Sequence, residues 1–282
     1  MALSTNDSGQ CPQYYTMENG ISAAMDAWER VAMVDYEELT SKSSLISHIV
    51  KLAKQGTVKV LDVGCGTGMF WKVLGNKIKQ QLVPECMLNI TVSLVDISDY
   101  CLDTAAQTLR GLGITVKEKF QTSLENVHLS LSAGQSFDII WSLHSLSSVE
   151  PRKIRTFFEN VPKLLNADGA YWNLQQARSS FYCEADVFHS KIQGHAQPQF
   201  LTAEKIHDLA TSVTTMKDIT IQELEYYHWV QKSDTDTIEK YLHKLVFDNK
   251  FGIKEATPLI EKYLINSGWY KFPQRSLVLS TK

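Results

Sequence analysis

A short glycine-rich loop directly after an apolar strand is the feature of this sequence that most constrains its fold. The strand-like run Val58–Val63 leads into Gly64-Cys-Gly-Thr-Gly68, and a helical pattern of apolar residues follows. Glycines at alternate positions let the backbone pass close to a ligand, because no Cβ atom intervenes. The N-terminus of the next helix offers free backbone N–H groups to a polar group held there. The loop therefore predicts a ligand site at the carboxyl end of a strand.

Strand-like and helix-like segments alternate around this loop. We expect parallel strands over residues 58–63, 90–95, 114–119, 137–141 and 170–174. This alternation predicts an α/β fold with a doubly wound, mostly parallel sheet. Two later segments, 219–230 and 276–280, complete a seven-stranded sheet, the last as a short edge or hairpin strand. Residues 176–202 have weak periodicity and are expected to form an irregular insertion after strand five.

The composition excludes several functional classes. The five cysteines are widely spaced and include no Cys-x-x-Cys pair, so neither a disulfide framework nor a metal site is expected. A net charge of −3 lacks the basic excess that is typical of nucleic-acid binding. The N-terminus has no basic segment followed by an apolar run, and no apolar stretch approaches the roughly 18 residues of a membrane span. We expect a cytoplasmic protein with no nucleic-acid or membrane partner.

An acid follows the second strand. Asp96 stands where a carboxylate can accept hydrogen bonds from both hydroxyls of a ribose. A dinucleotide site needs Gly-x-Gly-x-x-Gly, which would put the third glycine at position 69. That position is Met69, and the glycine falls one residue earlier, at Gly68. The pattern therefore predicts a nucleoside site and argues against a nicotinamide oxidoreductase.

With this spacing, residues 60–68 resemble motif I of the class I S-adenosylmethionine-dependent methyltransferases. Leu94-Val-Asp96 resembles the ribose-binding acid of that family, residues 137–146 resemble its fourth strand and turn, and residues 164–170 resemble its approach to strand five. The resemblance covers residues 58–175. The N-terminal aromatic helix, the insertion after strand five and two C-terminal helices before a last strand resemble the plan of the histamine N-methyltransferase-like small-molecule methyltransferases.

The resemblance implies a Rossmann-like methyltransferase fold with S-adenosylmethionine as cofactor. The glycines would line the methionine part, with Cys65 as a small residue between them. Asp62 would hold the loop or reach the cofactor's amino group, and Asp96 would bind the ribose. The implied cofactor-binding residues are Asp62, Gly64, Cys65, Gly66, Gly68, Asp96, Ile97, Thr122, Ser123, Ser142 and Leu143.

His144 is the candidate catalytic residue. Methyl transfer is a direct displacement in which the protein mainly aligns the reacting groups. A base is needed only if the attacking atom must lose a proton. His144 directly follows strand four, at the carboxyl edge of the sheet, and is the titratable ring best placed for that role. Local packing is its alternative role.

The acceptor is expected to be a small molecule methylated on nitrogen or oxygen, with an aromatic or imidazole amine among the candidates. The turn Ser142-Leu-His-Ser145 lacks the proline-containing run that is usual in methyltransferases of nucleobase or amide nitrogens. Aromatic walls suit a ring that bears an amine. The residues implied to bind the acceptor are Tyr14, Tyr15, Trp28, Phe181, Tyr182 and Gln274.

The expected organisation is a flexible tail over residues 1–13 and a single methyltransferase domain over 14–282. The cofactor-binding core covers about 56–175, and a lid and insertion on the substrate side cover about 14–40 and 176–217. Two other functions stay open: methylation of a protein side chain, and a non-catalytic cofactor-binding scaffold subunit. The sequence leaves the oligomeric state unknown and is compatible with a monomer.

Overall fold

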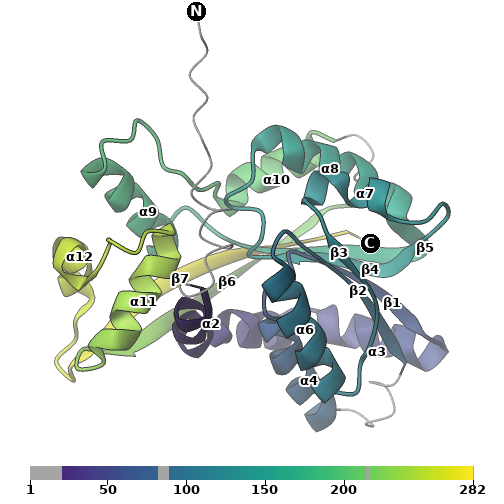
Figure 1. Cartoon of the computed structure of the whole chain (residues 1–282), viewed down its shortest axis with the longest axis horizontal. Coiled ribbons are helices and arrows are strands. Elements are labelled where there is room, and N and C mark those ends of the chain that lie inside the picture. The colour runs from purple at the N-terminus through teal and green to yellow at the C-terminus, as the bar shows by residue number, and fades with distance from the viewer. Residues whose placement is uncertain (1–20, 82–88, 214–215, 217, 282) are drawn as a thin grey trace, which may run out of the picture. The chain divides into compact units, whose positions relative to one another are not determined.

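A computed structural model describes residues 21–81, 89–213, 216 and 218–281 (Figure 1). The expected tail, Tyr14 and Tyr15 lie outside these described residues. The chain divides into two compact units. Among the described residues, the core unit comprises those within 33–178, 201–226 and 275–281, and the accessory unit comprises 21–32, 179–200 and 227–274.

The described residues form a seven-stranded sheet with the order β3-β2-β1-β4-β5-β7-β6. Strands β1 to β5 pair in parallel, and β7 pairs antiparallel with β5. The predicted doubly wound, mostly parallel sheet is therefore confirmed. The strands are β1 (Val58–Val63), β2 (Ile90–Asp96), β3 (Thr115–Gln121), β4 (Phe137–Leu143), β5 (Leu165–Gln176), β6 (Thr220–Gln231) and β7 (Trp269–Ser280).

The position of each strand in the sheet explains its composition. The central strands β1, β2 and β4 are buried at almost every residue, because helices cover both faces of a parallel sheet. Strand β3 stands at the edge and alternates between exposed and half-buried residues. Its lysines and glutamate suit an exposed edge, since charged side chains discourage pairing with another chain.

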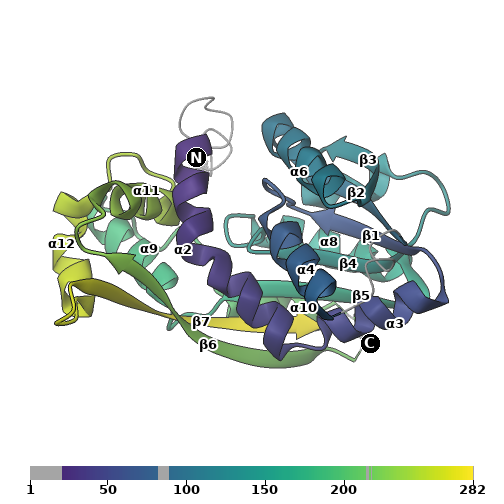
Figure 2. The same cartoon turned by 90° about the horizontal axis from the view of Figure 1, so that it is seen from below.

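Helices cover both faces of the core unit's sheet (Figures 1 and 2). On one face lie α3 (Leu45–Gln55), α4 (Met69–Gln81) and α6 (Asp99–Gly111). On the other lie α7 (Val127–Ser130), α8 (Pro151–Leu164) and α10 (Ala203–Thr211), with the short turn η1 (Leu124–Asn126) before α7. Phe157 and Phe158 of α8 pack against Tyr171 of β5, with ring centroids 6.0 and 5.8 Å apart. Pro151 occupies the first turn of α8, as predicted.

The accessory unit is mainly helical. Its helices are α9 (Phe181–Ile192), α11 (Thr235–Val246) and α12 (Ile253–Ile260), followed by η2 (Glu261–Tyr263). The long helix α2 (Ile21–Lys42) and the strands β6 and β7 contribute residues to both units. Phe272 of β7 stacks on Phe181 with centroids 4.0 Å apart and on Tyr270 at 5.6 Å, which gives the accessory unit an aromatic core of its own.

Two local predictions were wrong. The segment expected to be irregular contains α9, whose first turn is capped by the Ser180 hydroxyl accepting from the Cys183 N–H at 3.3 Å. Asp186 and His189 are buried in this helix, so its buried face does not read as an apolar stripe. The last strand is twelve residues long and lies between β5 and β6. Its buried polar residues Gln274 and Ser276 hide its alternation.

Candidate functional site

The glycine loop joins the ends of β1 and β2 before α4 begins. The backbone N–H groups of Gly64 and Cys65 both donate to the Val95 carbonyl, at 2.8 and 3.1 Å. Gly64, Gly66 and Gly68 have φ angles of +73°, +51° and +81°. These values lie in the left-handed region, which glycine adopts without a Cβ penalty. The alternate glycines are therefore required by the path of the backbone.

The three glycines differ in what surrounds them. A Cβ atom on Gly64 would lie 2.3 Å from the Ser145 Cβ, and one on Gly68 would lie 3.1 Å from the Ala105 Cα. These two positions are closed by packing. A Cβ on Gly66 would meet no described protein atom within 4 Å. The open side of Gly66 is a space in which a ligand can approach the backbone.

Asp96 lies beside this open glycine. Its Oδ2 accepts the Gly66 N–H at 3.0 Å, and its Oδ1 accepts the Ser98 N–H at 3.0 Å. The Asp96 carbonyl accepts the Thr122 N–H at 3.1 Å, which brings the turn after β3 to the same edge. Ile97 follows with 41% of its surface exposed. The structure thus gathers predicted cofactor residues from three strand ends.

Asp62 is buried under the loop. Its Oδ2 accepts the indole N–H of Trp71 at 2.7 Å, which ties β1 to α4. Burial raises the pKa of Asp62 to about 7, and the Trp71 hydrogen bond partly offsets this effect. Of its two predicted roles, holding the loop is the one that this contact supplies. Burial also raises the pKa of the Cys65 thiol well above its usual value, so Cys65 stays a small protonated residue.

Three predicted cofactor-binding residues are buried or bonded to other side chains of the protein. Ser142 is fully buried, and its hydroxyl pairs with the Tyr171 hydroxyl and accepts from the Asn173 amide at 3.1 Å. Leu143, the last residue of β4, is also buried. The Ser123 hydroxyl accepts the Asn126 amide at 3.1 Å. Their contact with a cofactor stays a prediction.

His144 directly follows β4 and has an unusual backbone. Its φ of +54° lies in the left-handed region, and its N–H donates to the Leu174 carbonyl at 2.8 Å. Its Nε2 lies 3.1 Å from Oδ2 of Asp35, a fully buried acid of α2. Sequence reasoning missed Asp35. The available signal was an acid three residues after buried Ala32 and four before buried Leu39, on the apolar stripe of the helix.

Three of the residues predicted to bind the acceptor meet in the accessory unit. The Trp28 ring lies 5.9 Å from that of Tyr182 and stacks on Tyr241 at 5.7 Å. The Gln274 amide nitrogen lies 3.4 Å from the Tyr241 hydroxyl and 3.3 Å from Nδ1 of His228. The Gln274 carbonyl oxygen is buried and has no hydrogen bond within the described part of the chain. Phe181, by contrast, is part of the aromatic core around Phe272.

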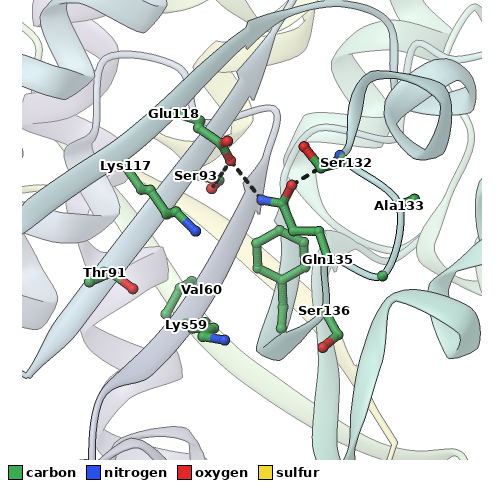
Figure 3. A pocket seen from close by; sticks show the side chains of 12 residues that line it. Lys59, Val60, Thr91, Ser93, Lys117, Glu118, Ser132, Ala133, Gln135 and Ser136 are labelled. Carbon is green, nitrogen blue, oxygen red and sulfur yellow. Dashed lines mark hydrogen bonds between the residues drawn. The ribbon is translucent and has the colours of Figure 1, made fainter.

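A separate polar pocket opens near the amino ends of β1, β2 and β4 in the core unit (Figure 3). There the Glu118 carboxylate accepts from the Gln135 amide at 2.6 Å and from the Ser93 hydroxyl at 3.4 Å. Lys59, at the start of β1, also lines this pocket. None of the predicted site residues lines this pocket. The pocket is therefore distinct from the glycine loop, which lies at the carboxyl ends of the strands.

The sequence of the core unit matches a known family. Residues 61–171 match the family described as "Methyltransferase domain". This range begins within β1 and ends within β5, and it includes the glycine loop, Asp96 and His144. Among the described residues, no helix is both long and apolar enough to cross a membrane. No group of three or more His, Cys, Asp or Glu side chains in the described ranges could hold a metal ion.

Solved methyltransferases share the fold at low sequence identity. The plantazolicin methyltransferase BamL, in complex with a triazolic desmethylPZN analog and SAH, is 14% identical, with a TM-score of 0.52 over 98% of this chain and 96% of that one. The magnesium protoporphyrin IX methyltransferase ChlM from Synechocystis PCC 6803, with bound SAH, is 13% identical, with a TM-score of 0.52. The match covers 97% of this chain and 99% of that one. These similarities show the fold alone.

A curated relative is much longer than this chain. The non-reducing polyketide synthase mapC from Penicillium brevicompactum is 24% identical over 208 residues. The alignment covers 74% of this chain but only 8% of that protein.

Proposed function

We propose that this chain is an S-adenosylmethionine-dependent methyltransferase and that it methylates a nitrogen or oxygen atom of a small molecule; the match of residues 61–171 to a methyltransferase domain supports this proposal. The observation that carries the proposal is the open side of Gly66 beside the Asp96 carboxylate. A further part of the proposal is that the acceptor is an aromatic or imidazole amine, as the histamine N-methyltransferase-like plan of the sequence implies.

The residues at the glycine loop fit the cofactor. Asp96 offers carboxylate oxygens to ribose hydroxyls, and exposed Ile97 offers an apolar surface to adenine. The space beside Gly66 allows the methionine part to approach the backbone without meeting a Cβ. S-adenosylmethionine supplies an activated methyl group on a sulfonium, whose sulfur leaves as a neutral thioether. The protein therefore has to align the acceptor and, where the attacking atom carries a proton, to remove that proton.

The cluster around Trp28 supports a small acceptor. Its rings pack on one another, and the Gln274 carbonyl, which has no hydrogen bond among the described residues, is the group of this cluster that can accept an N–H or O–H. Apolar walls with a few polar groups are typical of small-molecule sites. Two proteins with the same fold are named plantazolicin methyltransferase and magnesium protoporphyrin IX methyltransferase. His144 is the proposed base.

A methyl-transfer assay tests the proposal. The full chain is incubated with S-adenosylmethionine labelled in the methyl group and with aromatic amines, imidazoles and phenols, each tested alone. We expect label in at least one small molecule, and its loss with Asp96→Ala. The control Asp103→Ala removes an exposed acid of α6 that pairs with Lys119 and should keep the activity.

Two outcomes would contradict the proposal. Label found only in added protein would favour methylation of a protein side chain. Tight binding of S-adenosylmethionine without transfer to any acceptor would favour the non-catalytic scaffold subunit.

A further inference from the structure

A buried polar network lies behind His144 in the core unit. Asp35 is fully buried, and its Oδ2 accepts the Gln176 amide at 3.2 Å. The same amide nitrogen lies 3.2 Å from the Tyr226 hydroxyl, which pairs with the Ser276 hydroxyl at 2.6 Å. Four elements, α2, β5, β6 and β7, each contribute one residue. Burying a carboxylate is costly unless it is hydrogen-bonded or paired, so this network fixes where the Asp35 charge lies.

The network presents its charge to the His144 ring. Nε2 lies 3.1 Å from the Asp35 Oδ2, within ion-pair distance. Nε2 makes no formed hydrogen bond within the described ranges. At this distance, a proton on Nε2 that is directed at Oδ2 forms a charge-assisted hydrogen bond. The Tyr36 ring, 5.7 Å away between centroids, borders the same imidazole.

The backbone of His144 points to a functional role. A left-handed φ is unfavourable for a residue with a side chain, and such residues concentrate at functional sites. The N–H bond to Leu174 fixes this conformation at the end of β4. A histidine that only filled space would need neither the strained backbone nor a buried acid behind its ring.

We infer that Asp35 is a positioning residue that keeps the His144 proton on Nε2, so that Nδ1 is the atom that accepts a proton from the acceptor. The inference rests on the proposed function and deepens it. The acceptor's X–H proton moves to Nδ1, and the electron pair of X forms the bond to the methyl carbon. The pair of the broken sulfur–carbon bond stays on sulfur. The resulting imidazolium is stabilised by the Asp35 carboxylate.

This arrangement defines the class of acceptor. A base is useful only where the attacking atom carries a proton that must leave, as in a hydroxyl or an N–H group. A tertiary amine has no such proton and gains nothing from His144. The site is therefore built for acceptors with an O–H or N–H at the methylated atom.

The protonated nitrogen of the ring can be measured directly. Long-range ¹H–¹⁵N spectra of the full chain labelled with [¹⁵N]histidine, at alkaline pH where the ring is neutral, report which nitrogen carries the proton. The His144 signal is assigned by its absence in His144→Asn. We expect the Nε2–H form to exceed the other by roughly tenfold or more. Asp35→Asn, of nearly the same shape, should weaken or reverse this preference.

A second histidine–aspartate pair provides the matched control. His189 and Asp248 of the accessory unit lie 2.9 Å apart. Asp248→Asn should change the His189 signal and leave that of His144 unchanged. A His144 proton found on Nδ1 in the unmodified chain would overturn the inference without any variant. So would an unchanged preference in folded Asp35→Asn.

Turnover separates this inference from the proposed function. With an acceptor found in the methyl-transfer assay, Asp35→Asn should lower kcat by roughly 10²-fold or more and leave the Kd of S-adenosylmethionine within about twofold. If His144 shows the predicted tautomer but no methyl transfer is found, the proposed function is contradicted, while the interaction between Asp35 and His144 is supported. If methyl transfer is found and Asp35→Asn leaves kcat unchanged, the positioning role of Asp35 is contradicted, while the proposed function is supported.

Discussion

Gly66 donates its backbone N–H to Oδ2 of Asp96 across 3.0 Å, so the loop after β1 and the acid that ends β2 are bonded to each other. The other oxygen of the carboxylate is held by the Ser98 N–H at 3.0 Å. The carboxylate is thus oriented before a ligand arrives. Such preorganisation lowers the ordering cost of binding, and it places the open glycine beside Asp96, the acid proposed to bind the ribose.

Asp96→Ala should weaken the binding of S-adenosylmethionine by roughly ten- to a hundredfold, because hydrogen bonds to a charged group contribute about 1.5–3 kcal/mol. Titration calorimetry measures the Kd, and thermal unfolding checks that the variant is folded. The control Asp103→Ala should bind normally. Unchanged affinity in a folded Asp96→Ala chain would disprove the ribose assignment.

Gly66→Ala and Gly64→Ala should fail in different ways. The new methyl group at position 66 meets no described protein atom, so the variant should fold with a strain of about 1–2 kcal/mol but lose cofactor affinity. At position 64 it would lie 2.3 Å from the Ser145 Cβ, which should destabilise the fold. Gly113→Ala is the matched control, since Gly113 has φ +79° and open space. If Gly66→Ala and Gly113→Ala bind S-adenosylmethionine with equal affinity, the open side of Gly66 is not the cofactor site.

Ser142→Ala should lower the stability of the chain. Its hydroxyl pairs with the buried Tyr171 hydroxyl and accepts from Asn173. Leaving such buried groups unsatisfied costs about 1–3 kcal/mol. Urea unfolding measures the loss. If the Kd of S-adenosylmethionine rises tenfold while the free energy of unfolding is unchanged, Ser142 contacts the cofactor as its sequence position suggested.

Asp62 should make the stability of the chain depend on pH. Burial raises its folded-state pKa to about 7, so between about pH 4 and pH 7 the folded chain keeps a proton that the unfolded chain has released. The free energy of unfolding therefore falls as pH rises through this window. Between about pH 5 and about pH 8, the ionisation of Asp62 lowers the free energy of unfolding by about 3 kcal/mol.

Asp62→Asn keeps an acceptor for the Trp71 N–H and has no charge to bury. Urea unfolding at the two pH values should show a smaller loss of stability for this variant than for the unmodified chain. The same pH dependence in both chains would mean that Asp62 ionises in the fold without cost.

The arrangement of the glycine loop and Asp96 could be predicted because its signals are local in the sequence. A glycine loop after a strand and an acid after the next strand follow from the spacing of Gly64, Gly68 and Asp96, and the structure brings them to one edge. The parallel sheet follows from the alternation of strands and helices over the core. These elements are set by patterns of a few residues that repeat at regular intervals.

The positioning acid behind His144 could not be predicted in the same way. Asp35 and His144 are far apart in the sequence, and only the packing of α2 brings the acid to the ring. Buried polar residues also misled the assignment of α9 and β7, because Asp186 and Gln274 interrupt the apolar pattern while lying inside the fold. Such residues are stabilised by specific partners, which a hydrophobic period does not reveal.

Titration calorimetry of the full chain with S-adenosylmethionine, S-adenosylhomocysteine and NAD tests the central claim most directly. The open glycine loop and Asp96 predict micromolar binding of the first two and no binding of NAD. Binding of NAD alone, or of none of the three by a folded chain, would contradict the assignment of this site to S-adenosylmethionine.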